Sequence, residues 1–332
     1  MAKVTVLVAV YNARKYLASC LNSLLRQTHR DWEAICVDDA STDDSRDILE
    51  SYARKDGRIR VMAMSCNGGQ AKARNAALKL ATGEFVCMLD SDDTFSDDAL
   101  QRALEVFEQH PATDSVLFDL MMCYDDRKES YPLPVFDSLS GTEAFERSLT
   151  WNIHGLYMIR TDIHRRFPYD ETSHAYSDDN TTRTHFLHSA EVRVCRGIYY
   201  YRQHGESVTH KATVRRFDYL DANLNMKKMM LQWQVEDRLI DLYENARWLN
   251  LVGVYMFYFH NRRKLPPVDS RYGLRKLKEM WLTVEVNRID AVHRRKFGYC
   301  PFRGHWWLFR CQEELYFCLR FILDLFRKGK MH

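Results

Sequence analysis

The sequence predicts an α/β fold: a mostly parallel sheet flanked by helices, with a helical extension at the C-terminal end. Short runs of apolar, β-branched residues alternate with helical patterns through roughly the first third of the chain. Such alternation is typical of a parallel sheet, because a crossover helix joins successive strands. From about residue 212 the pattern is helical almost to the end. We therefore expect an α/β domain over 1–210 and a helical region over 211–332.

The elements of the first domain follow in order from their apolar periods. Val4 to Val10 is a β-branched run of strand length, and apolar residues at 17, 20, 21, 24 and 25 mark a helix with one buried stripe. Further strands are expected at 32–37, 59–64, 84–89 and 155–160, with a pair of short strands over 192–201. Further helices are expected around 48–52, 70–81, 99–107 and 178–188, the first of them started by Ser41 or Thr42.

Composition and charge limit the class of protein. The chain has 332 residues, enough to bury a core, and its 46% apolar and 28% charged residues are ordinary for a globular protein. A net charge of +3 is too small to indicate nucleic-acid binding by itself. Residues 262–332 carry 17 Lys and Arg against 7 Asp and Glu, whereas the rest carry 31 against 38. This asymmetry favours a cation-assisted site in the acidic part and contact with an anionic surface by the basic part.

The cysteines and the hydropathy indicate the compartment. Nine cysteines without a CxxC or metal-ligand spacing are typical of reduced thiols in a cytosolic protein. A strand pattern that begins within a few residues of the first residue argues against a signal peptide. The sequence has no stretch of 18 apolar residues that is free of charge, so we expect no transmembrane helix. We therefore expect a cytoplasmic protein.

Acidic residues follow two of the predicted strands. Asp38 and Asp39 come after the second strand, and Asp90, Asp92 and Asp93 come after the fourth. In open α/β sheets ligands bind beyond the carboxyl ends of the strands. So many carboxylates repel one another unless a cation neutralises them, and oxygen ligands favour Mg²⁺ or Mn²⁺, which would also stabilise a departing diphosphate. The alternative is that these acids only cap helices, but two clusters in one crevice favour a site.

Several short segments carry a family resemblance. In order they are VAVYN at 8–12, YL, CL, SLL and QT within 16–28, VDDASTD at 37–43, ARNAAL at 73–78, GEF at 83–85 and LDSDD at 89–93. Together they closely resemble glycosyltransferase family 2, the inverting group with the GT-A (nucleotide-diphospho-sugar transferase) fold. The resemblance is strong over about 1–120 and weaker to about 210. It implies a hexosyltransferase-type enzyme that uses a nucleotide-diphosphate sugar, with a UDP-sugar favoured, and Mn²⁺ or Mg²⁺ as cofactor.

The resemblance implies donor-site roles for five residues. Tyr11 would stack on the nucleotide base, Asp39 would accept the imide hydrogen bond of a uracil, and Ala9 would line the floor of the base site. Asp90 would lie near the ribose, and Asp92 would be the main protein ligand of the metal, with Asp90 as the second candidate. We expect these five side chains to lie together at the carboxyl edge of the sheet.

The resemblance also implies catalytic roles. An inverting transferase needs a base that takes the proton of the acceptor hydroxyl as it attacks. The family carries an acidic pair at the start of a later helix, usually Glu-Asp, which here corresponds to Asp178 and Asp179. Asp179 is the expected base and Asp178 its neighbour, with helix capping as the alternative. Arg202 and His204 belong to a Tyr-Arg-x-His segment that is followed by Ser-x-Thr at 207–209, and would place positive charge or donors on the departing diphosphate.

The resemblance specifies the roles of Arg74 and of the acceptor residues less closely. Arg74 would reach the nucleotide or brace the carboxylates, the alternative being a solvent-facing helix arginine. Trp151, His154 and Gly155 lie in the part of the sequence that usually recognises the acceptor in this family. The expected acceptor is a glycan or lipid-linked hydroxyl in surface-polysaccharide biosynthesis. A dinucleotide-dependent oxidoreductase is disfavoured because the first turn, 10–14, has no glycine. A nucleotidyltransferase and a catalytically inactive GT-A-like module, binding glycan or acting as a scaffold, stay open.

The last helical stretch has its own pattern. Residues 306–326 are apolar and aromatic with one polar stripe, and basic residues flank them at 294–296 and 327–330. An amphipathic helix of this kind can lie in a membrane interface, which would make the protein peripheral at the cytoplasmic face. The alternative is packing against the preceding helices or a second subunit in a homo-oligomer. The sequence leaves both open.

Overall fold

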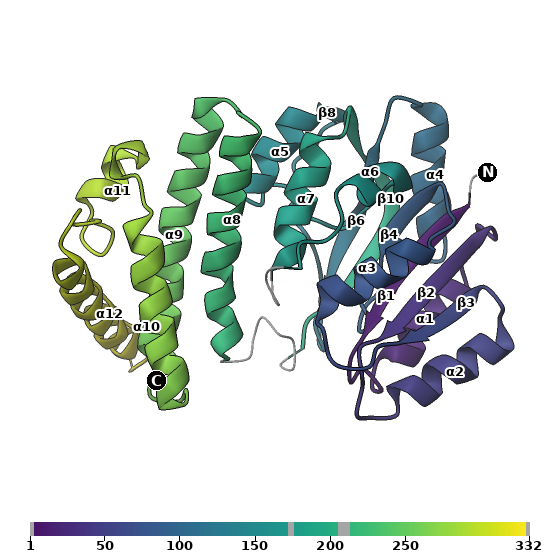
Figure 1. The fold of residues 1–332 in the computed structure, drawn as a ribbon, viewed down its shortest axis with the longest axis horizontal. Coiled ribbons are helices and arrows are strands. Elements are labelled where there is room, and N and C mark those ends of the chain that lie inside the picture. Colours follow the sequence, from purple (N-terminus) through teal and green to yellow (C-terminus); the bar gives the residue numbers. More distant parts are fainter. Residues whose placement is uncertain (1–2, 172–175, 205–212, 330–332) are drawn as a thin grey trace. The chain divides into compact units, whose positions relative to one another are not determined.

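The computed structural model describes residues 3–171, 176–204 and 213–329. The chain divides into two compact units, residues 1–207 and residues 208–332. The first unit contains the sheet with its covering helices, and the second is built from helices (Figure 1). All the residues that the sequence singles out as candidates for chemistry lie in the first unit.

The first unit is built on one mixed sheet. Its strands are β1 (Val4–Val10), β2 (Trp32–Asp38), β3 (Ile59–Ala63), β4 (Phe85–Met88), β5 (Thr94–Phe95), β6 (Ser115–Cys123), β7 (Lys128–Ser130), β8 (Ser138–Ser140), β9 (Tyr157–Arg160) and β10 (Glu191–Arg202). They run in the order β3-β2-β1-β4-β9-β6-β10-β5, with β7 on β6 and β8 on β10. β1 to β4 are parallel, whereas β9 runs antiparallel between β4 and β6. The parallel half therefore places the ends of β1, β2 and β4 at one edge.

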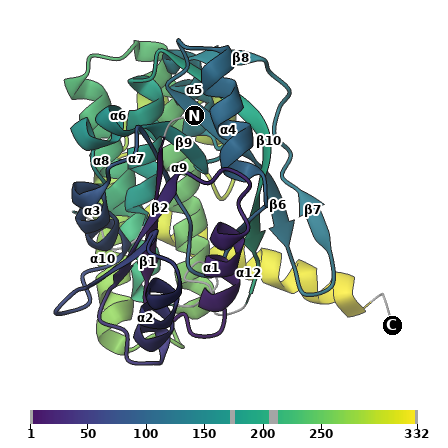
Figure 2. The same cartoon turned by 90° about the vertical axis from the view of Figure 1, so that its right-hand side faces the viewer.

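In the part of this unit that the structure describes, seven helices cover the two faces of the sheet. They are α1 (Leu17–Leu25), α2 (Ser45–Lys55), α3 (Gln70–Leu80), α4 (Ala99–Gln109), α5 (Gly141–Leu149), α6 (Thr161–Arg166) and α7 (Ser177–Leu187). Successive residues of β1 point to opposite faces: Val6 and Val8 join the core formed with α1, α2 and α4, and Leu7 joins the core formed with α3, α5 and α7. Every residue of β1 is buried, as expected for a strand covered on both faces (Figure 2).

The structure differs from the sequence expectations about strands at β10 and at β5 to β8, which were not expected. The segment 192–201 is not a pair of short strands but part of the single strand β10, whose pairing with β6 shifts register between Val194 and Ile198. Gly197 lies in that irregular stretch, where a Cβ atom would come within 2.7 Å of the Ala99 backbone, so the strand bends where α4 approaches it. β6 was not expected, because its apolar run of residues carries no clear period.

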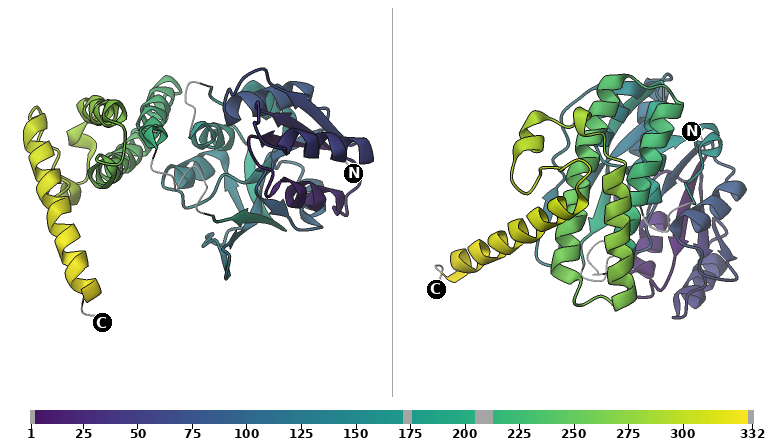
Figure 3. Two further views of the ribbon diagram at one scale, coloured as in Figure 1. Left: turned by 90° about the horizontal axis from the view of Figure 1, so that it is seen from below. Right: turned by 60° about the vertical axis from the view of Figure 1, so that its left-hand side comes forward.

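The second unit is helical, as the sequence predicts. Its elements are the 3₁₀ turns Val214–Phe217 and Val286–Arg288 and the helices α8 (Asp218–Gln232), α9 (Asp237–Asn261), α10 (Pro267–Leu282), α11 (Ala291–Arg295) and α12 (Trp306–Gly329). α10 begins at Pro267, where proline loses no helical hydrogen bond. Its core contains Trp248, Tyr255 and Phe309. Figure 3 shows these helices from two further sides. Among the described residues, none of the helices combines the length and apolarity that crossing a membrane requires.

Candidate functional site

Tyr11 stands at the carboxyl end of β1 and is held by the loop after β2. The next residue, Asn12, has a positive φ of 50°, a conformation that asparagine tolerates. The Asn12 N–H donates to Ser41 Oγ at 3.0 Å, and the Thr42 N–H donates to Asn12 Oδ1 at 2.8 Å. These bonds fix the turn while the Tyr11 side chain stays 49% exposed. An exposed aromatic ring on a fixed turn is available to a planar ligand.

Asp39 is buried and anchors a second loop. Its two carboxylate oxygens accept the N–H groups of Gly68 at 2.7 Å and Gly69 at 2.8 Å, just before α3. Gly69 has a φ of 88°, which favours glycine at this position. A carboxylate oxygen accepts more than one hydrogen bond, so Asp39 keeps acceptor capacity towards a ligand. Ala9, which is 9% exposed, is two residues from Tyr11 on β1.

Arg74 lies at the centre of the site and is not solvent-facing. The alternative that the sequence left open for it is wrong, because its side chain on α3 is 1% exposed. Its guanidinium forms an ion pair with Asp90 and lies 4.0 Å from Asp178 Oδ2. It also lies 5.3 Å from the centre of the Tyr169 ring. Arg74 therefore brings the acidic loop after β4 next to the acidic pair that begins α7.

The three acids after β4 have different surroundings. Asp90 accepts from Arg74 through its side chain, and its N–H donates to the Tyr199 hydroxyl at 3.1 Å. Asp93 is 1% exposed and accepts the Tyr199 O–H at 2.9 Å and the Arg202 N–H at 2.7 Å. Burial, followed by the charges of Asp90 and Asp92, raises the pKa of Asp93 well above its usual range. Asp93 thus ties this loop to β10.

Asp92 is the acid of this loop that stays accessible. Its side chain is 33% exposed, and its Oδ2 lies 2.9 Å from Nε2 of His204. Burial and the charge of Asp90 raise the pKa of the Asp92 carboxyl, although the His204 hydrogen bond opposes the shift. Nδ1 of His204 is buried without a hydrogen-bond partner in the structure. This hydrogen bond therefore connects the loop that carries Asp90 and Asp92 to the segment after β10.

Arg202 lies at the end of β10 beside the same loop. Its Nε donates to the backbone oxygen of Asp92 at 2.9 Å, and its guanidinium lies 4.9 Å from the centre of the Tyr16 ring. The His204 ring is 4.9 Å from the same tyrosine ring. The structure thus brings Arg202 and His204 together with Asp92. The Ser-x-Thr segment at 207–209 lies outside the described residues.

The acidic pair begins α7, as the sequence predicts. Asp178 Oδ1 accepts the N–H of Asp179 at 3.2 Å, whereas the N-cap of this helix is Tyr176, which forms no side-chain cap hydrogen bond. The Asp178 side chain is 37% exposed. Both acids thus lie in the first turn of α7, where the helix dipole favours negative charge.

The residues that the sequence suggested for acceptor binding, Trp151, His154 and Gly155, lie in packed surroundings. His154 is 5% exposed, and burial lowers its pKa to about 4, so it is neutral at pH 7. A Cβ atom on Gly155 would come within 2.7 Å of the Thr182 hydroxyl, so this glycine allows close packing of α7. The Trp151 ring lies 4.8 Å from the guanidinium of Arg183. His154 and Gly155 therefore contribute to packing.

Sequence reasoning missed Tyr199, and the metal ligands that it expected, Asp92 and Asp90, are not part of a complete ligand set in the described residues. Tyr199 is fully buried and bonds to both Asp90 and Asp93, and the signal that could have found it is its place in the buried alternation of β10. Within the described residues, no group of three or more His, Cys, Asp and Glu side chains is arranged to hold a metal ion. The protein alone therefore offers at most a partial ligand set there.

The chain shares sequence with known glycosyltransferases. The model of the family described as "Glycosyl transferase family 2" matches residues 5–169. The putative teichuronic acid biosynthesis glycosyltransferase TuaG of Bacillus subtilis is 38% identical over 159 residues, 48% of this chain and 62% of that protein. The uncharacterized glycosyltransferase EpsJ of the same organism is 32% identical over 223 residues, 62% of each chain. This chain thus spans about three fifths of the length of these two relatives.

A solved structure shows the same fold. The crystal structure of TarS 1–349 from Staphylococcus aureus in complex with UDP-GlcNAc superposes with a TM-score of 0.75, at 22% identity, over 95% of this chain and 91% of that one. The sequence of a poly(ribitol-phosphate) beta-N-acetylglucosaminyltransferase TarS from the same species is 41% identical over 113 residues, 33% of this chain and 20% of that protein. The GT-A fold and the helical C-terminal region expected from the sequence are confirmed. The sheet was expected to be mostly parallel and is mixed, because β9 runs antiparallel between β4 and β6.

Proposed function

Because residues 5–169 belong to glycosyl transferase family 2, we propose that this protein transfers a sugar from a nucleotide-diphosphate donor to an acceptor hydroxyl with inversion. The observation that carries the proposal is the pair of contacts made by buried Arg74, to Asp90 and to Asp178. One side chain thereby joins the expected donor motif to the expected catalytic helix. A fold with separate, unrelated acidic caps would not need this shared cation.

The donor nucleotide would bind at the edge formed by β1 and β2. The exposed Tyr11 ring would stack on the base, and the remaining lone pairs of Asp39 would accept an imide N–H. That acceptor role suits uracil, so a UDP-sugar is the favoured donor. TarS 1–349 has been crystallised in complex with UDP-GlcNAc and with UDP, which supports the choice of nucleotide for a chain of this fold.

The donor atoms beside the diphosphate position fit a divalent cation. Asp92 Oδ2 and His204 Nε2 are 2.9 Å apart in a hydrogen bond that a cation bound between them would replace, and carboxylate and imidazole are both ligands of divalent metals. Asp92 and His204 would therefore hold Mn²⁺ or Mg²⁺, with Asp90 nearby, and diphosphate oxygens and water would complete the ligand set. When bound, the ion would neutralise charge that grows on the leaving diphosphate. His204 would then act on the diphosphate through the ion rather than directly.

The residues of the chain would perform the remaining chemistry. Asp179, with Asp178 beside it, would take the proton of the acceptor hydroxyl as its oxygen attacks the anomeric carbon. The bond between that carbon and the diphosphate oxygen breaks on the opposite face, so the configuration inverts. Arg202 is fixed by its bonds to Asp92 and Asp93, and would donate to the departing diphosphate. Arg74 would hold Asp90 and Asp178 in register.

The acceptor class is proposed from the relatives. TuaG is named for teichuronic acid biosynthesis and TarS for poly(ribitol-phosphate), both of them cell-surface polymers. A glycan or lipid-linked acceptor of surface-polysaccharide assembly is therefore the favoured class here. The alternative is a catalytically inactive GT-A-like module that binds glycan or organises a complex. The Asp92–His204 pair and the acidic pair of α7 favour the enzyme, because an inactive module has no need of either.

The exposed apolar side of α12 supports a second partner. The ribbon of this helix is yellow in Figure 3. Its residues Trp307, Leu315, Leu319 and Ile322 are between 45% and 63% exposed, and the basic segment 294–296 precedes it. An anionic membrane surface on the cytoplasmic side or a second copy of the chain would cover these side chains. Sedimentation with anionic liposomes at low salt tests the first. Protein that stays in the supernatant and is dimeric by light scattering would favour a second copy of the chain.

The proposed activity is tested by nucleotide binding followed by transfer. Thermal unfolding would be measured with UDP, GDP, dTDP and NAD, each with and without Mn²⁺, since a ligand that binds the folded state raises its stability. We expect stabilisation by UDP that requires Mn²⁺ and is lost on chelation with EDTA and in Asp92→Asn. The exposed acid Asp44 provides a matched control, and Asp44→Asn should keep the shift. A metal-independent shift with NAD, or no shift with any nucleotide, would contradict the proposal.

A further inference from the structure

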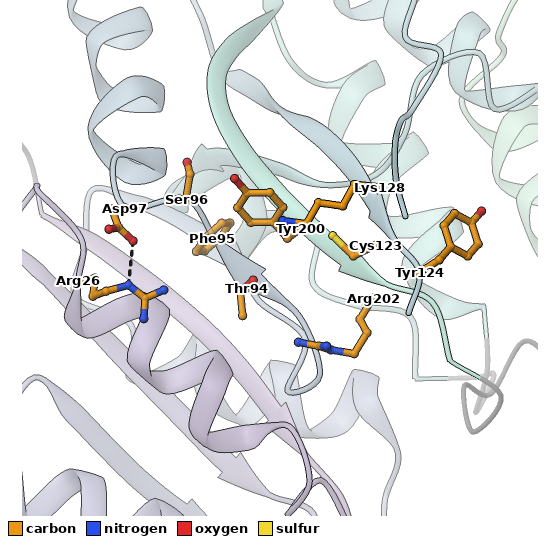
Figure 4. A pocket seen from close by; sticks show the side chains of 10 residues that line it. All are labelled: Arg26, Thr94, Phe95, Ser96, Asp97, Cys123, Tyr124, Lys128, Tyr200 and Arg202. Atoms are coloured by element: carbon orange, nitrogen blue, oxygen red, sulfur yellow. Dashed lines mark hydrogen bonds and ion pairs between the residues drawn. The ribbon is translucent and has the colours of Figure 1, made fainter. Parts of the chain in front are cut away.

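A pocket of about 580 Å³ lies beside the loop that carries Asp92 and Asp93, and Figure 4 shows the side chains that line it. The lining comes from the residue after α1, from β5, from the ends of β6 and β10, and from β7. Arg202 belongs both to this lining and to the proposed diphosphate site. A volume of this size is within the range of small-molecule sites. The pocket is therefore connected through Arg202 to the proposed site of sugar transfer.

The charged groups of the lining are mainly positive. Arg26, Lys128 and Arg202 line the pocket together with a single carboxylate, Asp97. That carboxylate is already paired, because Arg26 Nε donates to Asp97 Oδ1 at 2.9 Å. In the described part of the chain, no carboxylate oxygen lies within 4.0 Å of the cationic groups of Lys128 or Arg202. The pocket thus presents two positive charges that the described acids do not neutralise.

The β6–β7 hairpin directs Lys128 to this side. The Tyr124 N–H donates to the Arg127 backbone oxygen at 2.8 Å and closes the turn. Arg127 pairs with Asp126 at 3.1 Å and with Glu129 at 2.6 Å, so these two acids of the hairpin are paired with a cation other than Lys128. Lys128 and Glu129 are successive on β7 and point to opposite sides.

Two tyrosines contribute the rest of the recognition surface. Lys128 Nζ lies 4.9 Å from the centre of the Tyr200 ring, which keeps the ammonium over the pocket. Tyr124 lines the neighbouring wall. A tyrosine ring offers an apolar face to the C–H groups of a sugar or polyol, and its hydroxyl hydrogen-bonds to theirs. The pocket therefore combines positive charge with surfaces suited to a hydroxylated chain.

We propose that this pocket binds an anionic group of the acceptor, a phosphate or a carboxylate, carried on a hydroxylated unit beside the one that receives the sugar. Lys128 would contact the anion, the two tyrosines would contact the hydroxylated unit, and Arg202 would border both the acceptor and the donor. The proposal rests on the proposed function and specifies its acceptor class. A neutral glycan would gain nothing from these cations, so the charge determines specificity.

The test compares anionic and neutral probes on the full chain. A glycerol-phosphate trimer, a galacturonate trisaccharide and neutral maltotriose would be titrated by calorimetry, with and without UDP and Mn²⁺. The variant is Lys128→Gln, on an exposed strand where folding should tolerate it. Lys55→Gln is the matched control, because Lys55 is also exposed and lies 5.4 Å from a tyrosine ring, that of Tyr52, but does not line the pocket.

We expect at least one anionic probe to bind about tenfold more tightly than maltotriose at low salt. Lys128→Gln should lower the affinity for that probe about fivefold and leave the affinity for maltotriose unchanged. Lys55→Gln should change neither affinity. The tighter of the two anionic probes identifies phosphate or carboxylate as the source. Equal binding of charged and neutral probes, an unaffected Lys128→Gln, or no binding of either anionic probe would overturn the proposal. Absence of thermal stabilisation by UDP would instead contradict the proposed function. The two failures can be distinguished because the probe titrations without nucleotide do not depend on the donor site.

Discussion

Replacing Arg74 with methionine tests the ion pairs that hold the site together. Methionine keeps most of the apolar stem but removes the guanidinium, leaving the Asp90 carboxylate without its cation. Removing one partner of a buried pair costs about 3–5 kcal/mol. Asp90 is 23% exposed, so some solvent reaches it, and the 4.0 Å contact with the more exposed Asp178 adds little. We therefore expect unfolding free energy to fall by about 3 kcal/mol.

The assay is thermal unfolding followed by circular dichroism, on single and double variants. For a unit of this size, a loss of about 3 kcal/mol lowers the midpoint by about 6–12 °C. Asp90→Asn should also destabilise, because it leaves the buried guanidinium with Asp178 alone. The double variant should lose clearly less than the two single losses combined, since both remove the same interaction. Arg102→Met on α4, which breaks an exposed pair with Asp98, is the control and should change the midpoint little.

Two results would refute this reasoning. A midpoint for Arg74→Met within about 2 °C of the wild type would mean that Asp90 is well solvated without its partner. Additive losses for Arg74→Met and Asp90→Asn would mean that the contact contributes no coupling. Either would remove the physical basis for treating Arg74 as the connection between α3, the loop after β4 and α7.

Three further predictions concern separate parts of the chain. Tyr11→Ala should weaken UDP binding, measured by calorimetry with Mn²⁺, by about 1–3 kcal/mol without changing the unfolding midpoint, and unchanged affinity would exclude base stacking. Asp179→Asn should reduce sugar transfer by about 10²–10⁴-fold while UDP binding persists, whereas a larger loss in Asp178→Asn would move the base to that residue. Burial raises the pKa of Glu313 on α12 to about 8, so the folded state holds a proton that the unfolded state releases. Stability should therefore fall by about 1 kcal/mol per pH unit between about pH 5 and 8, and Glu313→Gln should flatten that slope in denaturant titrations.

Much of the site could be predicted because its residues follow strands in short motifs. Tyr11, Asp39 and Asp92 each belong to a motif that follows a predicted strand, and the ends of β1, β2 and β4 meet at one edge of the parallel part of the sheet. The helix that begins with the acidic pair was predicted for a similar reason, since its sequence signals are local. The donor edge of the site was thus accessible to sequence reasoning.

Other features depend on which segments the tertiary structure places next to each other. Nothing near Arg74 in sequence indicates that it is buried, because its partners Asp90 and Asp178 lie 16 and about a hundred positions away. Likewise, Lys128 and Arg202 line one pocket only because β6 pairs with both β7 and β10.

The sequence by itself determined the alternation of strands and helices, the acidic edge and the helical C-terminal unit. Periodicity and turn chemistry act over a few residues, and these features need no more than that. The tertiary structure decided which acids are accessible: Asp93 became a buried anchor, whereas Asp92 stayed open beside His204. Identical carboxylates acquire different roles because burial and neighbouring charge depend on contacts between distant segments.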